Sequence, residues 1–237
     1  MRILYKRSRI VLFFVCLTLY SQFLFAQDIQ TIKSDIYSKL RDRRCTTMSL
    51  DKCDCPDARE MKAYIDALLE MGINKEEIFY KVAKKFSLNT ILDKQIKLDV
   101  EKRLIKEVGS RRAQIILEPA SFDFCQVSKG KNKISKLFKL TNKGSDKLII
   151  KNIRALCGCT AVSLKIGKNK SPYFDTKGAP DNWQAQLRPN ESGELEIVLD
   201  LNHPSVGMGK LIREILITSN DPLYPEVTVR IEAEVKD

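Results

Sequence analysis

The sequence has little histidine and lacks several motifs that mark enzyme active sites. Its 237 residues include a single histidine, His203, which Pro204 follows in a predicted turn. It contains no nucleophile elbow, no paired-carboxylate motif and no glycine-rich phosphate loop. Hydrolase chemistry therefore has little support from the sequence.

Glycine, proline and repeated segments are also scarce. Ten glycines and eight prolines are too few for a disordered polymer, and no internal repeat or low-complexity tract occurs. Hydrophobic residues make up 43% of the chain and charged residues 30%, which is typical of a soluble globular protein. At 237 residues the chain is long enough for two modest domains, each with its own core.

Acidic residues are absent from the start of the chain, which predicts an export signal. Basic residues precede or open an apolar run from Ile10 to Tyr20, and Ala26 stands before the expected cleavage site at Gln27. We expect residues 1–26 to direct the protein to the periplasm; an uncleaved signal would anchor it in the inner membrane. Removal of the signal takes away four positive charges and lowers the net charge from +11 to +7. An exported basic protein is expected to meet an anionic membrane surface or an acidic partner rather than nucleic acid.

The first half of the chain has the apolar periodicity of helices. Apolar residues at helical spacing predict amphipathic helices over 28–44, 56–71 and 74–86. The expected arrangement is a small three-helix bundle over 27–90, followed by a helical linker over 91–112.

Beyond the linker the pattern changes to short β-rich runs separated by turn residues. Alternation is clear late in the chain, where Leu195, Ile197 and Leu199 share one face of a strand. Such short strands predict an all-β immunoglobulin-like sandwich over 113–237, so the whole chain is expected to be an α+β multidomain protein. Residues 167–184 are expected to form a long loop. The expected strands are 115–117, 121–127, 133–141, 147–155, 160–166, 194–201, 210–218 and 226–235.

The cysteines of the chain favour a function based on thiols or disulfides. After removal of the signal an even number of cysteines remains, which in an oxidising compartment suggests structural disulfides. Their pairing cannot be deduced from the sequence. The six are Cys45, Cys53, Cys55, Cys125, Cys157 and Cys159.

Cys55 lies directly before Pro56, which is expected at the first position of the second predicted helix. Free N–H groups and the positive end of the helix dipole face a thiol at that place, and Lys52 is close in sequence. We expect these groups to lower the pKa of Cys55 and to make it a reactive thiolate. Cys45 and either Cys53 or Cys55 would then form a redox-active pair. The alternative is a structural disulfide that joins the first helix to the next two.

An upstream helix, a cysteine motif and the helical hairpin CPDAREMKAYIDALLEMGINKEEIFYKVAKKF occur together in residues 36–87. In this combination the segment resembles the CcmH/NrfF family of periplasmic cytochrome c maturation proteins. The resemblance implies a three-helix bundle whose cysteines handle the thiols of apocytochrome c before haem attachment. The spacing differs, because the family has C-x-x-C whereas here seven residues separate Cys45 from Cys53-Asp54-Cys55.

The second half contains the segments FDFCQV, FKLTNKGSDKLIIKNIRALCGCT and LITSND. With these segments, residues 115–237 resemble a bacterial exported domain of unknown function in the Hydin-type immunoglobulin-like superfamily. The resemblance implies a fold rather than an activity. Cys125 stands where this pattern is expected to have glycine.

Cys157-Gly158-Cys159 forms a second close pair of cysteines, at the end of a predicted strand. In an extended chain, residues two apart are separated by about 6.6 Å, so a bridge needs a local turn, which Gly158 permits. A labile or structural disulfide is the favoured interpretation, with Cys125 as an alternative partner. The other alternative is a metal site that binds Cu(I) through Cys157 and Cys159. Zinc is not expected in the first half, because its three cysteines have no fourth local ligand.

Together these patterns predict an exported protein whose helical module handles the thiols or disulfides of a client. The resemblance to the CcmH/NrfF family implies an apocytochrome c or the haem-attachment machinery as the client, and the immunoglobulin-like domain is expected to dock it. The sequence leaves open whether the chain is an enzyme, a thiol–disulfide oxidoreductase, and no cofactor is expected. The alternatives are an envelope scaffold with purely structural disulfides, and copper binding at the second cysteine pair.

Overall fold

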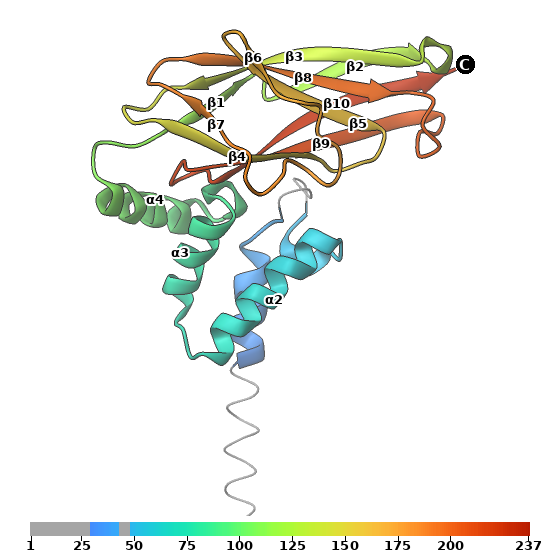
Figure 1. Cartoon of the computed structure of the whole chain (residues 1–237). Coiled ribbons are helices and arrows are strands. Elements are labelled where there is room, and N and C mark those ends of the chain that lie inside the picture. The colour runs from blue at the N-terminus through green and yellow to red at the C-terminus, as the bar shows by residue number, and fades with distance from the viewer. Residues whose placement is uncertain (1–28, 43–47) are drawn as a thin grey trace, which may run out of the picture. The chain divides into compact units, whose positions relative to one another are not determined.

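The computed structural model describes residues 29–42 and 48–237 (Figure 1). The chain divides into two compact units, of which the first ends at Phe79 and the second runs over Tyr80–Asp237. The predicted signal and Cys45 lie outside the described residues. Within the described ranges, no helix has the length and hydropathy needed to cross a membrane.

Helices occur close to the places that the sequence predicts. The first, residues 29–38, ends before the expected residue 44. Beyond it Leu40 O accepts a hydrogen bond from the distant Leu50 N at 2.7 Å, so the chain has left the helix there. The later elements are the 3₁₀ turn η1 (Leu50–Lys52), α2 (Pro56–Glu70), α3 (Lys75–Lys85), the 3₁₀ turn η2 (Leu88–Thr90) and α4 (Lys94–Val108).

Polar contacts join residues 29–38 to α2 in the first unit. The Tyr37 hydroxyl donates to Asp66 Oδ1 at 2.7 Å, and Lys33 Nζ pairs with Asp66 Oδ2 at 2.8 Å. Apolar side chains buried in this unit form its hydrophobic core, and the burial of each large one stabilises the fold by about 1.5–3 kcal/mol. They are Ile36, Leu40, Leu50, Ala58, Met61, Ile65, Leu68, Ile78 and Phe79.

The helix starts follow from their capping residues. Cys55 is the N-cap of α2 and Pro56 its first residue, as predicted. Asn74 Oδ1 accepts a hydrogen bond from Glu77 N at 2.9 Å at the start of α3. The boundary between the two units falls inside α3, so the three-helix bundle expected over 27–90 remains a prediction.

All eight predicted strands occur, each within two residues of its expected bounds. Two short strands were not predicted, and one of them, β6, lies within the segment 167–184 that was expected to be a loop. The strands are β1 (Ile115–Glu118), β2 (Ser121–Ser128), β3 (Lys133–Asn142), β4 (Leu148–Ala155), β5 (Thr160–Ile166), β6 (Asn169–Lys170), β7 (Ala185–Leu187), β8 (Ser192–Asp200), β9 (Gly209–Ser219) and β10 (Glu226–Lys236). A 3₁₀ turn, η3 (Lys129–Lys131), follows β2.

The strands form two five-stranded sheets around one core, which confirms a β-sandwich (Figure 1). One sheet has the order β1-β3-β8-β5-β6 and the other β2-β10-β9-β4-β7. Neighbouring strands are antiparallel except for the parallel pair β2 and β10. Leu195, Ile197 and Leu199 are all buried, as their alternation predicts.

Two connections between the sheets meet at one place in the sandwich. The chain crosses from one sheet to the other between β4 and β5, and the later connection from β8 to β9 crosses in the opposite direction. Backbone hydrogen bonds join these segments, because Asp200 N donates to Cys159 O at 2.8 Å and Leu156 N donates to Glu214 O at 3.0 Å. Residues 156–159 are thereby held between the end of β8 and strand β9.

Candidate functional site

Two Cys-X-Cys pairs, one in each unit, are the candidate sites. Cys53 and Cys55 belong to the first unit, and Cys157 and Cys159 belong to the second. No disulfide joins any two of the described cysteines, which are these four and Cys125.

The first pair lies where η1 gives way to α2. Cys53 is the C-cap of η1, and the thiol of Cys55 accepts a hydrogen bond from Ala58 N at 3.4 Å at the start of α2. Lys62 Nζ donates to Cys53 O at 2.6 Å and so holds the short connection against the helix. The end of η1 thus positions Cys53, and the start of α2 positions Cys55 two residues later.

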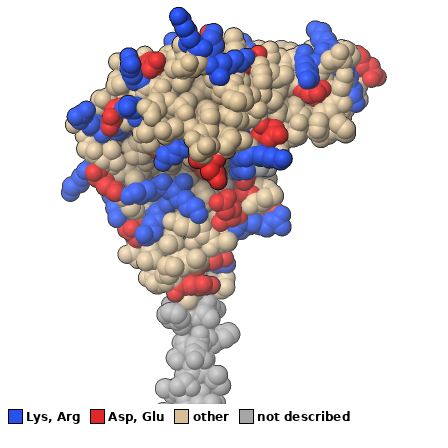
Figure 2. Space-filling model, viewed as in Figure 1, with Lys and Arg blue, Asp and Glu red and all other residues tan. Residues whose placement is uncertain are grey.

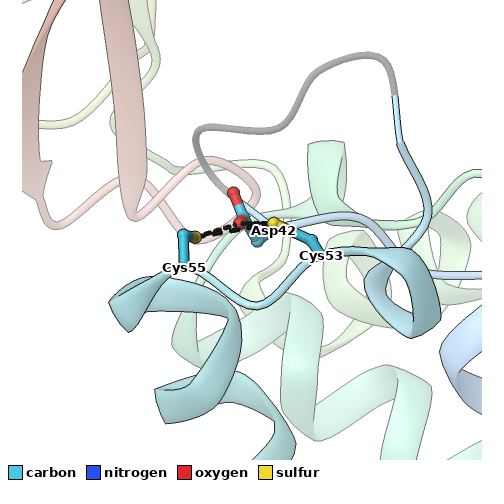
Figure 3. A group of neighbouring side chains, drawn as sticks. All are labelled: Asp42, Cys53 and Cys55. Carbon is cyan, nitrogen blue, oxygen red and sulfur yellow. Dashed lines mark hydrogen bonds between the residues drawn. The ribbon is translucent and has the colours of Figure 1, made fainter.

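A carboxylate oxygen from another segment is hydrogen-bonded to both sulfurs (Figure 3). The thiol of Cys55 donates to Asp42 Oδ2 at 2.7 Å, and the thiol of Cys53 donates to the same oxygen at 3.1 Å. The sulfurs themselves are 3.6 Å apart. Asp42 and Cys53 are 1% and 3% exposed, whereas Cys55 is only half-buried. The group is therefore closed on the side of Asp42 and Cys53 and open at Cys55.

The pKa of Cys55 is raised rather than lowered, although the helix start itself acts in the expected direction. Burial is the largest effect, and together with the hydrogen bond to Asp42 it raises the pKa of Cys55 to about 11. The hydrogen bond from Ala58 N acts in the expected direction but is outweighed. At neutral pH this thiol is therefore protonated and a weak nucleophile.

The second pair occupies the turn between β4 and β5. Thr160 N donates to Cys157 O at 3.1 Å, which closes the four residues into the local turn that the sequence required. Gly158 lies against the ring of His203, and a Cβ at this position would be only 3.2 Å from His203 Nε2. The close approach of the two segments thus favours glycine between the cysteines.

The sulfurs of this pair are in contact with each other and with polar groups from β9 and the β8–β9 connection. Cys157 Sγ and Cys159 Sγ are 3.0 Å apart, and Arg213 Nε donates to Cys159 Sγ at 2.9 Å. Ser205 Oγ lies 3.5 Å from Cys157 Sγ and 2.8 Å from His203 Nδ1. Cys159 is buried whereas Cys157 is half-buried, so only one of the two sulfurs is open to a partner.

The surroundings of Cys157 favour its thiolate. Burial opposes ionisation, but hydrogen bonds from Ser205 and Cys159 and the positive charge of Arg213 outweigh it. They hold the pKa of Cys157 below its ordinary value. A larger fraction of this thiol is therefore reactive at neutral pH than of an ordinary cysteine.

The other sequence-based candidates lie apart from these pairs. Cys125 is exposed on β2, where its amide donates to Asp123 Oδ1 at 2.8 Å. Its φ of 57° explains why glycine was expected there. A copper site at Cys157 and Cys159 remains a prediction, and the guanidinium of Arg213 beside Cys159 weighs against a cation at that place.

Sequence reasoning missed the charged neighbour of each pair. Asp42 carries no local signal, because it lies in an irregular segment after the first helix. Arg213 has a local signal in the sequence. It lies two residues from each of the buried Leu211 and Ile215 on β9, so it is on the inward face of the strand. A charged residue at such a position indicates a buried polar partner.

Surface charge does not single out a partner. On the face shown in Figure 2, Lys and Arg side chains are interspersed with Asp and Glu. Binding to an anionic membrane surface or to an acidic partner remains a prediction.

Residues 115–172 match the family described as "Protein of unknown function (DUF1573)". The C-terminal part of the chain therefore contains a DUF1573 domain. The match includes Cys157 and Cys159 and ends before Arg213. No curated protein matches the chain.

Several solved structures are similar to the sandwich. A protein of unknown function from Porphyromonas gingivalis W83 is 16% identical with a TM-score of 0.39, over 53% of this chain and 48% of that one. The ASH/PapD-like domain of human CEP192 is 13% identical with a TM-score of 0.33, and the match covers 53% of this chain and 87% of that one. The periplasmic chaperone SfaE is 10% identical with a TM-score of 0.32, and the match covers 52% of this chain and 57% of that one. The chain thus spans about half the length of the Porphyromonas protein. These likenesses concern the fold alone.

Proposed function

We propose that this protein exchanges thiols and disulfides with a client protein, and that Cys157 and Cys159 perform the exchange. The observation that carries the proposal is the contact between their sulfurs, 3.0 Å apart, beside the guanidinium of Arg213. Thiol–disulfide exchange needs an accessible thiolate and a second thiol within reach of the first. Cys157 fits the first role and the buried Cys159 fits the second.

The first step is attack by the Cys157 thiolate on a disulfide of the client. A bond forms between Cys157 Sγ and one client sulfur, the client disulfide breaks, and the other client sulfur leaves as a thiolate that takes a proton. Arg213 keeps a positive charge beside the reacting sulfurs while negative charge passes from one to another.

The second step resolves the mixed disulfide. Cys159, deprotonated, attacks Cys157 Sγ, the bond between Cys157 and the client breaks, and the second client sulfur leaves as a thiolate. Two electrons and two protons have then passed to the client, and the chain holds a Cys157–Cys159 disulfide. A dithiol reductant restores the thiols by the same steps in reverse.

Features of the sequence support a setting for this chemistry. The predicted signal at 1–26 supports action in the periplasm, where disulfides form and persist. The resemblance of residues 36–87 to the CcmH/NrfF family supports an apocytochrome c, or the haem-attachment machinery, as the client. That resemblance assigns thiol chemistry to Cys45, Cys53 and Cys55. The raised pKa of Cys55 is the reason for placing the exchange at the second pair instead.

The test is reduction of a small aromatic disulfide by the reduced full-length protein. Cys157→Ser is expected to abolish the fast phase of the reaction. Cys159→Ser is expected to stop it at a mixed disulfide on Cys157, which mass spectrometry of the intact protein detects. Cys125→Ser, at an exposed cysteine outside both pairs, is the matched control and should leave the rate unchanged.

Two results would contradict the proposal. One is a fast phase that persists in Cys157→Ser but is lost in Cys55→Ser, which would return the exchange to the first pair. The other is a protein whose cysteines resist both oxidants and reductants, which would identify the chain as an envelope scaffold with structural sulfur.

A further inference from the structure

We propose that Asp42, Cys53 and Cys55 form a zinc site, contrary to the expectation from the cysteine spacing alone, because the fold adds Asp42 to the two cysteines. The ligand atoms would be Asp42 Oδ2, Cys53 Sγ and Cys55 Sγ, which all lie within 4.8 Å of one another. The site belongs to the first unit and does not depend on the exchange chemistry proposed for Cys157 and Cys159.

The donor set selects the ion. Two sulfurs and one carboxylate oxygen suit Zn²⁺, which accepts both kinds of ligand. Mg²⁺ and Ca²⁺ require oxygen ligands, and Cu(I) favours soft sulfur over a carboxylate. On binding, the two thiols lose their protons to solvent, and the resulting site carries three negative charges around the dication.

The distances are close to those of a tetrahedral zinc site. With Zn–S of about 2.3 Å and Zn–O of about 2.1 Å, the sulfurs lie roughly 3.8 Å apart and each sulfur roughly 3.6 Å from the oxygen. The sulfurs here are already 3.6 Å apart, and the oxygen is 2.7 Å and 3.1 Å from them. Loading therefore requires the carboxylate to move outward by roughly 0.5–0.9 Å while the sulfurs stay in place.

Burial gives the site a protected side and an open side. Asp42 and Cys53 are almost fully buried, and buried carboxylates and thiols of this kind are typically satisfied by each other or by a metal. Cys55 is half-buried, and among the described residues no fourth ligand atom joins these three, so the fourth coordination position would be filled from outside the described residues or by water.

The site would join two segments that are separate in sequence. Asp42 follows the first helix, whereas Cys53 and Cys55 lie at the start of α2. Zinc would fasten these segments together and would also withdraw both thiols from disulfide exchange. It would thus keep the first pair reduced in an oxidising compartment.

The experiment measures zinc in the full-length protein, reduced, freed of metal and then incubated with Zn²⁺. We expect one tightly bound zinc per chain, and with Co²⁺ as the probe a sulfur-to-cobalt charge-transfer band. Cys53→Ser and Cys55→Ser should lose the band. Asp42→Asn should weaken zinc binding at least about tenfold, because even the removal of an outer-shell partner costs that much.

Matched controls separate ligand loss from general damage. Asp57→Asn changes another buried aspartate at the start of α2, and Cys157→Ser changes the other cysteine pair; both should bind zinc as the unchanged protein does. A measurement without substitutions guards against variants that fail to fold: zinc should slow the alkylation of Cys53 and Cys55 in the unchanged chain. The proposal is overturned by the absence of zinc binding, by binding that is lost in Cys157→Ser, or by binding that Asp42→Asn leaves intact.

Discussion

The two Cys-X-Cys pairs of this protein have the same spacing but opposite charges beside them. The first pair shares the carboxylate oxygen of Asp42, at 2.7 Å and 3.1 Å, and the second receives a hydrogen bond from the guanidinium of Arg213 at 2.9 Å. In both pairs one sulfur is buried and the other half-buried. Spacing and burial are thus alike, and the neighbouring charge distinguishes the two sites.

The neighbouring charge is one of the influences on which form of the thiol is favoured, beside burial and other hydrogen bonds. A carboxylate stabilises the protonated thiol and attracts a cation, whereas a guanidinium stabilises the thiolate and repels a cation. The pKa of Cys55 is raised, mainly by burial and next by the hydrogen bond to Asp42. The pKa of Cys157 is lowered despite its burial, first by the hydrogen bond with Ser205, then by those with Cys159, and also by the charge of Arg213. The first pair is therefore suited to metal and the second to exchange.

Reversing the charge beside the second pair should have the largest effect. In Arg213→Asp a carboxylate replaces the guanidinium, so the pKa of Cys157 should rise above its ordinary value. Each unit of pKa changes the thiolate fraction at pH 7 about tenfold, so alkylation of Cys157 by iodoacetamide should slow by more than about tenfold. An unchanged rate would show that Arg213 does not control this thiol.

Removing the charge without reversing it should have a smaller effect of the same sign. In Arg213→Gln the midpoint of the alkylation rate against pH should move upward for Cys157, and the rate at pH 7 should fall severalfold, because less of the thiol is ionised. Arg213→Lys keeps the charge and should recover part of the rate. Arg230→Gln, in which the arginine that pairs with Glu232 on β10 is replaced, should leave the profile unchanged. A profile that shifts equally in the two glutamine variants would refute a local effect.

The first pair also has a structural role that the second lacks. Cys55 caps α2, so Cys55→Ala should lower the free energy of unfolding by about 1 kcal/mol, whereas Cys55→Ser should preserve it because serine is a good N-cap. Urea denaturation of the metal-free protein measures both. Cys157 caps no helix, so Cys157→Ala should lower the free energy of unfolding by less than Cys55→Ala does. A larger decrease in Cys157→Ala would contradict this distinction.

The smallest effect is expected at the glycine of the second pair. A methyl group at Gly158 would lie 3.2 Å from His203 Nε2, so Gly158→Ala should displace the ring by a few tenths of an ångström. Because His203 lies in a surface connection, the free energy of unfolding should fall by no more than about 0.5 kcal/mol. Gly130→Ala, whose new Cβ would have only an ordinary contact with Ser128 at 3.6 Å, is the control. A loss of several kcal/mol would show that the turn is rigid.

The fold could be predicted well because its signals are local. Alternating apolar residues determined the eight main strands, and capping residues such as Cys55 and Asn74 determined the helix starts. Strands β6 and β7 were missed because two or three residues are too few for alternation to be seen. The first helix was predicted to be too long because the apolar periodicity of residues 28–44 does not reveal the backbone hydrogen bond between Leu40 and Leu50.

The chemistry of the sites could not be predicted, because it depends on contacts between distant residues. The cysteines and their spacing were visible in the sequence, but Asp42 lies 13 residues before Cys55 and Arg213 lies 54 residues after Cys159. The helix start of α2 acts on Cys55 in the predicted direction, but burial and a carboxylate outweigh it. An alternation pattern that places Arg213 inward was the one available signal.

One residue-resolved measurement tests the opposite roles of the two pairs most directly. The reduced full-length protein is alkylated at pH 7 with and without one equivalent of Zn²⁺, and mass spectrometry follows the modification of Cys53, Cys55, Cys157 and Cys159. We expect Cys157 to react first in both samples, and zinc to slow Cys53 and Cys55 only. Zinc protection of Cys157 and Cys159, or faster alkylation of Cys55 than of Cys157 without zinc, would contradict the account.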